Sequence, residues 1–236
     1  MQEYVQSIGI LVLYFVVLAS LAGGYRVFGN PEDEIFRKIL HFILLGSLPV
    51  FLFCFATWTG AVAAALGFAV VVYPLLHFAE RIKGFSHFFH ERKGGEIKKS
   101  LLLVFGMFAV VIAVCWGYFD DRLLAMAGVY AWGIGDALAA IIGKRYGKHK
   151  IRGRFLDGKK SLEGSGAMFA ASFFSVFGIL LLRGGPVWYL LMGIALITAL
   201  VTTLVELYAK EGNDTVYCPL AATTVMLLFL QMISDL

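Results

Sequence analysis

The chain has 236 residues, of which 60% are hydrophobic and only 15% are charged. Soluble proteins carry roughly a quarter charged residues, so this composition excludes an ordinary soluble globule and indicates an integral membrane protein. The formal net charge of +4 is small, and the positions of the charges along the chain are more informative than their sum.

Apolar segments recur along the whole chain, each long enough to cross a hydrocarbon core of about 30 Å as a helix. Lipid offers backbone groups no hydrogen-bond partner, so the spans should be helices and the fold all-α. The predicted spans are residues 8–28, 39–57, 59–78, 101–119, 123–142, 162–182, 187–208 and 216–233. These eight spans leave no room for a separate soluble domain, and we predict one integral membrane domain over residues 1–236.

The first span is expected to stay in the mature protein. Residues 1–7 contain one acid and no Lys or Arg, whereas a cleavable signal peptide begins with a basic leader.

The basic residues alternate between the connections that follow the spans. Of the 20 Lys and Arg residues, 18 lie in the connections after the first, third, fifth and seventh spans, and only Arg122 and Arg183 lie elsewhere. The positive-inside rule therefore predicts that these odd-numbered connections are cytoplasmic and that both termini are outside. In this bundle, any loop-built catalytic site should face the cytoplasm.

The connection at residues 143–164 carries the strongest indication of a ligand site. It contains eight basic residues, five glycines and only Asp157 and Glu163 as acids. Glycine lets backbone N–H groups approach an anion, and Lys and Arg neutralise its charge, so the composition suits a polyphosphate. The alternative is that such basic loops only fix the topology and bind anionic lipid headgroups.

A near match to a P-loop lies at residues 153–161, with the hydroxyl one place late. We reject a true P-loop, because that motif follows a strand and here a membrane helix precedes it. Ser161 can instead cap the sixth span, so that the free N–H groups of that helix lie beside Lys159 and Lys160.

Four acids are predicted at the cytoplasmic side of the bundle: Asp136, Glu163, Glu206 and Asp214. Asp136 lies about two helical turns inside the fifth span, where a lone carboxylate costs a few kcal/mol and needs a partner. Carboxylates beside a phosphate site suit Mg²⁺ held between the protein and the phosphates. The alternatives are that Asp136 and Glu206 pair with Lys or Arg, and that Glu163 only complements a helix dipole.

A further motif opens the second span. Arg37 and His41 are four residues apart and share one side of the predicted helix, with Lys38 beside them. Taken alone, these residues would be a topogenic pair followed by a buried histidine.

Together these motifs resemble the CTP-dependent polyprenol kinases, a family that includes dolichol kinase, phytol kinase and a CTP-using diacylglycerol kinase. The matching stretches are GDALAAIIGKRYG at 135–147, GKKSLEG at 158–164, RKILH at 37–41, Glu206, and DTVYCP at 214–219. The resemblance thus spans most of the chain, and the central stretches are the most specific. Thr215 departs from the pattern, because the family usually has Asn after this Asp.

The resemblance implies a membrane kinase domain that uses CTP as phosphoryl donor, a divalent cation such as Mg²⁺, and a lipid alcohol as acceptor. It implies catalytic roles for Asp136, Arg37 and Lys38, with Asp136 the first candidate for the proton acceptor. The implied metal ligands are Asp136, Glu206 and Asp214. The implied nucleotide-binding residues are Gly143, Lys144, Gly147, Gly158, Lys159, Lys160, Ser161 and Glu163.

Two rival functions remain at this point. A phosphatidate cytidylyltransferase also uses CTP and Mg²⁺, but its extended carboxy-terminal signature is absent here. An anion transporter would carry ionisable residues along its pathway, whereas the charges here gather at one face. We expect no nucleic-acid partner, leave a homodimer open, and place the protein in a cytoplasmic membrane or an endomembrane such as the endoplasmic reticulum.

Overall fold

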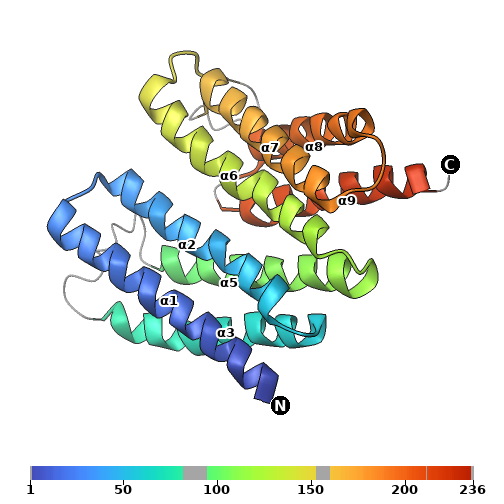
Figure 1. The fold of residues 1–236 in the computed structure, drawn as a ribbon. Helices are drawn as coiled ribbons and strands as arrows, with labels where there is room; N and C mark the ends of the chain where they lie inside the picture. The colour runs from blue at the N-terminus through green and yellow to red at the C-terminus, as the bar shows by residue number, and fades with distance from the viewer. Residues whose placement is uncertain (1, 82–94, 153–159, 211, 235–236) are drawn as a thin grey trace. The chain divides into compact units, whose positions relative to one another are not determined.

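The computed structural model describes residues 2–81, 95–152, 160–210 and 212–234. Helices dominate these residues (Figure 1). A π-helical segment, η1, continues α5. The elements are α1 (Gln2–Gly29), α2 (Asp33–Cys54), α3 (Trp58–Ala79), α5 (Glu96–Val111), η1 (Ile112–Tyr118), α6 (Arg122–Tyr146), α7 (Leu162–Arg183), α8 (Trp188–Tyr208) and α9 (Asp214–Ser234).

Within these ranges, eight helical segments are long and apolar enough to cross a membrane, so the predicted spans and the all-α fold are confirmed. The ends shift by a few residues: α1 already begins at Gln2, and the fourth span runs from α5 through η1. The tight connection between α2 and α3 is also confirmed. The side chain of Thr57 caps α3 there by accepting a hydrogen bond from the Gly60 N–H.

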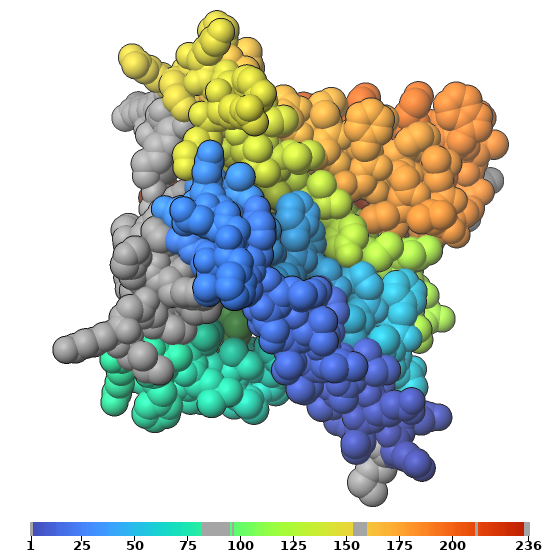
Figure 2. Space-filling model, turned by 60° about the vertical axis from the view of Figure 1, so that its left-hand side comes forward, coloured from blue at the N-terminus to red at the C-terminus, as the bar shows by residue number. Residues whose placement is uncertain are grey.

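The contacts group the chain into two compact units, Met1–Ala113 and Val114–Leu236. In the first unit α1 packs against α2, and α3 packs against α5. Its core is rich in phenylalanine: the Phe105 ring lies 5.9 Å from the Phe51 ring and 5.8 Å from the Phe108 ring, both edge to face. Side chains of α1 form part of the surface of this unit, in dark blue in Figure 2, as expected of a helix that faces lipid.

In the second unit α6 packs against α7 and α9, and α8 packs against the same two helices. Glycines let these helices approach closely. A Cβ atom on Gly128 would overlap with the side chain of Thr223 on α9, and one on Gly135 would overlap with Met168 on α7. Small residues at helix crossings are the usual means of close packing in membranes.

Polar contacts join α6 and α7 at the end of this unit where α6 starts and α7 ends. Asp121 caps α6 by accepting a hydrogen bond from the Leu124 N–H at 2.8 Å, and it pairs with Arg183 at the end of α7. The candidate site lies at the other end of these two helices.

Candidate functional site

The connection that leads into α7 is held closed at its base by backbone hydrogen bonds. The Ile151 N–H donates to the Lys160 carbonyl and the Leu162 N–H to the His149 carbonyl, each at 2.9 Å. Lys150 and Ser161 thereby form an antiparallel bridge, and the residues described here contain no longer strand. Ser161 begins the helix as predicted: it is 3% exposed, and its Oγ accepts a hydrogen bond from the Gly164 N–H.

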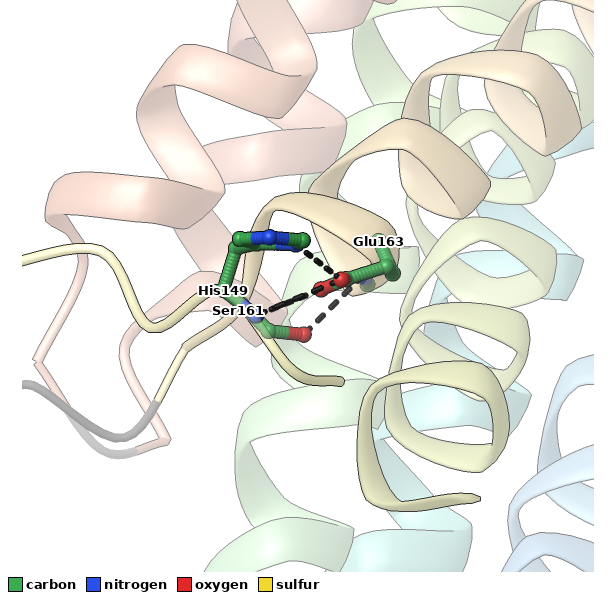
Figure 3. Close-up of polar contacts among 4 residues, drawn as sticks. His149, Ser161 and Glu163 are labelled. Carbon is green, nitrogen blue, oxygen red and sulfur yellow. Dashed lines mark hydrogen bonds and ion pairs between the residues drawn. The ribbon is translucent and has the colours of Figure 1, made fainter. Parts of the chain in front are cut away.

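Contacts of the Glu163 side chain with His149 also hold the base of the connection closed (Figure 3). The Glu163 carboxylate accepts a hydrogen bond from the His149 N–H at 3.2 Å, and its Oε1 lies 2.7 Å from His149 Nδ1. Glu163 is therefore more than an acid that complements a helix dipole. No sequence motif points to this role of His149, whose partner Glu163 lies on the other side of the connection.

Three of the five glycines in this region have a packing role. Gly143 near the end of α6 faces Gly164 near the start of α7. A Cβ on Gly164 would lie 3.0 Å from the Ala139 carbonyl and 3.2 Å from the Gly143 Cα. A Cβ on Gly147 would overlap with the Gly143 carbonyl and with Ser161. These glycines let α6 and α7 meet at the base of the connection, which places Ser161 and Lys160 against the bundle.

Lys144, in the last turn of α6, stays a predicted phosphate-binding residue. Gly158 and Lys159 lie outside the described residues, and their predicted roles stay predictions as well.

The side chain of Lys160, just before α7, reaches the end of α8. Its Nζ lies 2.9 Å from Oε1 of Glu206 and also donates to the Glu206 backbone carbonyl. Glu206 is only 8% exposed, so this ion pair compensates a charge that would be costly to leave alone. The pairing of Glu206 with a lysine, one of the alternatives raised by the sequence, is present in the structure.

Asp214 and Asp136 complete the cluster. Asp214 is the first residue of α9, and its Oδ2 accepts a hydrogen bond from Trp132 Nε1 on α6 at 3.2 Å. Asp136 lies one turn after Trp132 on the same helix. Both Glu206 and Asp214 lie within electrostatic range of Asp136 and of Lys160. The structure thus brings three carboxylates from α6, α8 and α9 together with the ammonium of Lys160, which lies just before α7, at one end of the second unit.

The chemistry of this cluster fits a magnesium ion bound together with phosphates. Among the described residues, no three His, Cys, Asp or Glu side chains already surround a point that could hold a metal. Mg²⁺, however, is commonly held by one or two carboxylates together with substrate phosphates. The hard oxygen donors of Asp136, Glu206 and Asp214 suit that mode, and their role as metal ligands stays a prediction.

The predicted residues of the second span lie in the first unit. Arg37 NH1 is 3.4 Å from Oε2 of Glu34, within the first turns of α2. His41 is half-buried rather than buried, and its ring meets that of Phe42. Lys38 lies beside Arg37, and the proposed catalytic roles of both bases stay predictions.

The chain is similar to the phytol kinase of Synechocystis sp., with 29% identity over 229 residues that cover 93% of this chain and 89% of that protein. No family model matches the chain. No solved structure matches it either. The similarity over nearly the full length confirms the resemblance to the polyprenol kinase family that the motifs indicate.

Proposed function

We propose that this membrane protein is a CTP-dependent lipid-alcohol kinase, which transfers the γ-phosphoryl group of CTP to the hydroxyl of a polyprenol, dolichol, phytol-like alcohol or diacylglycerol. The similarity to a phytol kinase supports a lipid-alcohol kinase. The CTP donor follows from the motif resemblance.

One observation carries the proposal: the cluster of Asp136, Glu206, Asp214 and Lys160 at the start of α7. Like charges gathered in a partly buried place repel one another and cost folding energy, so such clusters are enriched at functional sites. A bound cation would relieve this repulsion and could join the carboxylates to a polyphosphate. The basic, glycine-rich connection beside the cluster supplies the groups for the polyphosphate.

On the donor side, Lys144, Lys159 and Lys160 would neutralise the triphosphate of CTP, and Ser161 and the glycines of the connection would offer hydrogen-bond donors. Glu163, whose carboxylate accepts a hydrogen bond from the His149 N–H, would hold the base of the connection in place for the nucleotide. Lys160 is already beside the carboxylates, so its ammonium can balance phosphate charge from the position that it occupies. Asp136, Glu206 and Asp214 would hold Mg²⁺, which supplies charge neutralisation on the phosphate oxygens when it is bound.

In the reaction, the oxygen of the lipid alcohol attacks the γ-phosphorus of CTP, and the bond from that phosphorus to the β-phosphate oxygen breaks. CDP leaves with the electron pair of that bond. The proton of the alcohol passes to a carboxylate, and Asp136 is the first candidate. Arg37 and Lys38 are proposed to stabilise charge on the transferred group. Phosphoryl transfer depends mainly on positioning and charge stabilisation, so no nucleophilic side chain is needed.

The proposal includes a cytoplasmic site with both termini outside. Lys148 is exposed at the base of the connection, so a Lys148→Cys variant without the native cysteines offers a probe of its side. An impermeant thiol reagent should label it only in inverted vesicles or permeabilised cells. Labelling in intact cells would place the site on the outer face and remove the access to cytoplasmic CTP that the proposal requires.

The activity itself is tested with the purified protein in detergent. CTP, ATP, GTP and UTP are each supplied with Mg²⁺ and with a panel of phytol, a polyprenol, dolichol, diacylglycerol and phosphatidate. We expect a phosphorylated alcohol with CTP as the preferred donor. A CDP-lipid formed from phosphatidate would identify a cytidylyltransferase instead, and no turnover with any pair would contradict both enzymatic functions.

A further inference from the structure

A cleft of about 550 Å³ opens between the end of α8 and the start of α9. It is lined by Leu204, Val205 and Tyr208 on α8, by Lys210 and Asn213 in the connection, and by Tyr217 on α9, among others. Its volume lies within the range of sites for small molecules. The polar cluster described above does not use any of these side chains.

The cleft has an apolar part and a polar part. Leu204, Val205 and the rings of Tyr208 and Tyr217 form apolar walls along the two helices, whereas Lys210 and Asn213 lie at the loop. Tyr208 and Tyr217 are 58% and 55% exposed on helices that span the membrane. Tyrosine is enriched where the hydrocarbon meets water, so we expect this cleft to lie at the membrane boundary, within reach of lipid.

Two residues that line the cleft are direct sequence neighbours of two acids of the carboxylate cluster. Val205 directly precedes Glu206, and Asn213 directly precedes Asp214. Glu206 turns inward to Lys160 while Tyr208 is exposed on the same last turn of α8. The cleft and the carboxylate cluster therefore share the same pair of helix ends.

We propose that this cleft binds the acceptor alcohol, with the first part of its isoprenoid chain against Leu204, Tyr208 and Tyr217 and its hydroxyl end at Lys210 and Asn213. The proposal rests on the function proposed above and adds the place of the acceptor. A lipid alcohol is a long apolar chain with one small polar end, and the cleft has the same division. A nucleoside triphosphate would need several cations, and among the described residues that line the cleft only Lys210 is a cation.

Filling the cleft tests the assignment. Leu204→Trp places a large ring inside it, and Leu181→Trp on α7 is the matched control, because both leucines are 46% exposed and Leu181 does not line the cleft. With phytol as acceptor, kcat/KM should fall by about 10-fold or more in Leu204→Trp and remain near wild type in Leu181→Trp. With the short alcohol prenol the Leu204→Trp loss should be much smaller, and the KM for CTP should not change.

A second measurement does not depend on turnover or on the folding of a variant. A phytol analogue with a photoreactive diazirine in its first isoprene unit is cross-linked to the wild-type protein, and the labelled peptides are identified with and without excess phytol. We expect labelling within residues 204–217 that phytol competes away.

The outcomes separate the two proposals. Competed labelling at the cleft without phosphorylation of any alcohol would overturn the proposed function and leave the binding site standing. Active phosphorylation with competed labelling elsewhere, or with Leu204→Trp unchanged toward phytol, would overturn the acceptor site alone.

Discussion

The starts of α2 and α7 both carry basic side chains beside acids, but they arrange them differently. At α2 the charges pair locally: Arg37 with Glu34 one turn earlier, and Arg26 with Asp33 across the turn from α1. At α7, Lys160 instead reaches Glu206 on another helix, within electrostatic range of Asp214. In the first arrangement each acid pairs with a base close to it in sequence, whereas in the second the described residues bring three acids and one base into one partly buried place.

This difference separates charges that fix a helix end from charges that serve a ligand. Local pairs at a partly exposed helix end such as this one contribute on the order of 1 kcal/mol. Carboxylates brought together from three helices by tertiary packing cost energy unless a cation joins them. The comparison therefore favours the start of α7 as the centre of the chemistry.

The largest effect is expected from a substitution within the carboxylate cluster at the start of α7. Asp136→Asn keeps the shape of the side chain and removes the charge that a hard cation requires, so kcat should fall by more than about 100-fold. Asp33→Asn, the matched change at α2, should stay within about two-fold because its exposed pair is weak. Steady-state kinetics over a range of Mg²⁺ concentrations checks both, with thermal unfolding in detergent as the test of folding. Near-normal turnover with unchanged Mg²⁺ dependence in Asp136→Asn would show that Asp136 is neither a metal ligand nor the base.

A smaller effect should distinguish phosphate binding from topology within the basic connection. If Lys159 contacts the triphosphate, Lys159→Ala should lose about 1.5 to 3 kcal/mol, or about 10- to 150-fold in kcat/KM for CTP. Lys148, which is exposed in the same connection, is the control, and Lys148→Ala should stay within a few-fold of wild type. If Lys159→Arg costs as much as Lys159→Ala, the compact shape of the ammonium matters as well as its charge. Equal losses at Lys148 and Lys159 would indicate diffuse attraction by the whole connection instead of a specific contact.

The smallest effect concerns the packing that places α7. Gly164→Ala inserts a Cβ against the backbone of α6, and overpacking of this kind costs about 1 to 3 kcal/mol. Gly166→Ala, two residues later, meets nothing within 4 Å and should be neutral or slightly stabilising, because Ala favours a helix. The midpoint of thermal unfolding in detergent compares the two variants. If both lowered it equally, the close approach of α6 and α7 would not be what Gly164 provides.

The sequence predicts the spans well, because the membrane imposes length and apolarity on each helix separately. The Ser161 cap was predictable for a similar reason, since capping acts within one turn of the chain. The partners of the charged groups were harder to predict. The contacts of His149 with Glu163 and of Trp132 with Asp214 join residues far apart in sequence, and only the packing of α6, α7 and α9 decides them.

The glycines of the connection show a second limit of sequence reasoning. Their number predicts an anion cradle, which stays a prediction, and the structure shows in addition that Gly143, Gly147 and Gly164 lie where α6 and α7 meet. Composition cannot distinguish a glycine that exposes backbone N–H groups from one that makes room for a neighbouring helix. Gly143 and Gly147 are four residues apart near the end of a span. This spacing is typical of helix crossings in membranes, and it is the feature of the sequence that indicates a packing role.

The central claim is that the site at the start of α7 transfers the γ-phosphoryl group of CTP to a lipid alcohol. It is tested most directly by supplying the purified protein with phytol and Mg²⁺ together with CTP labelled either at the γ- or at the α-phosphorus, in wild type and in Asp136→Asn. The account predicts that the lipid product of the wild-type protein carries label from the γ-position alone, with an equal amount of CDP released, and that Asp136→Asn gives almost none. Label from the α-position in a lipid product, or equal γ-transfer by Asp136→Asn, would contradict it.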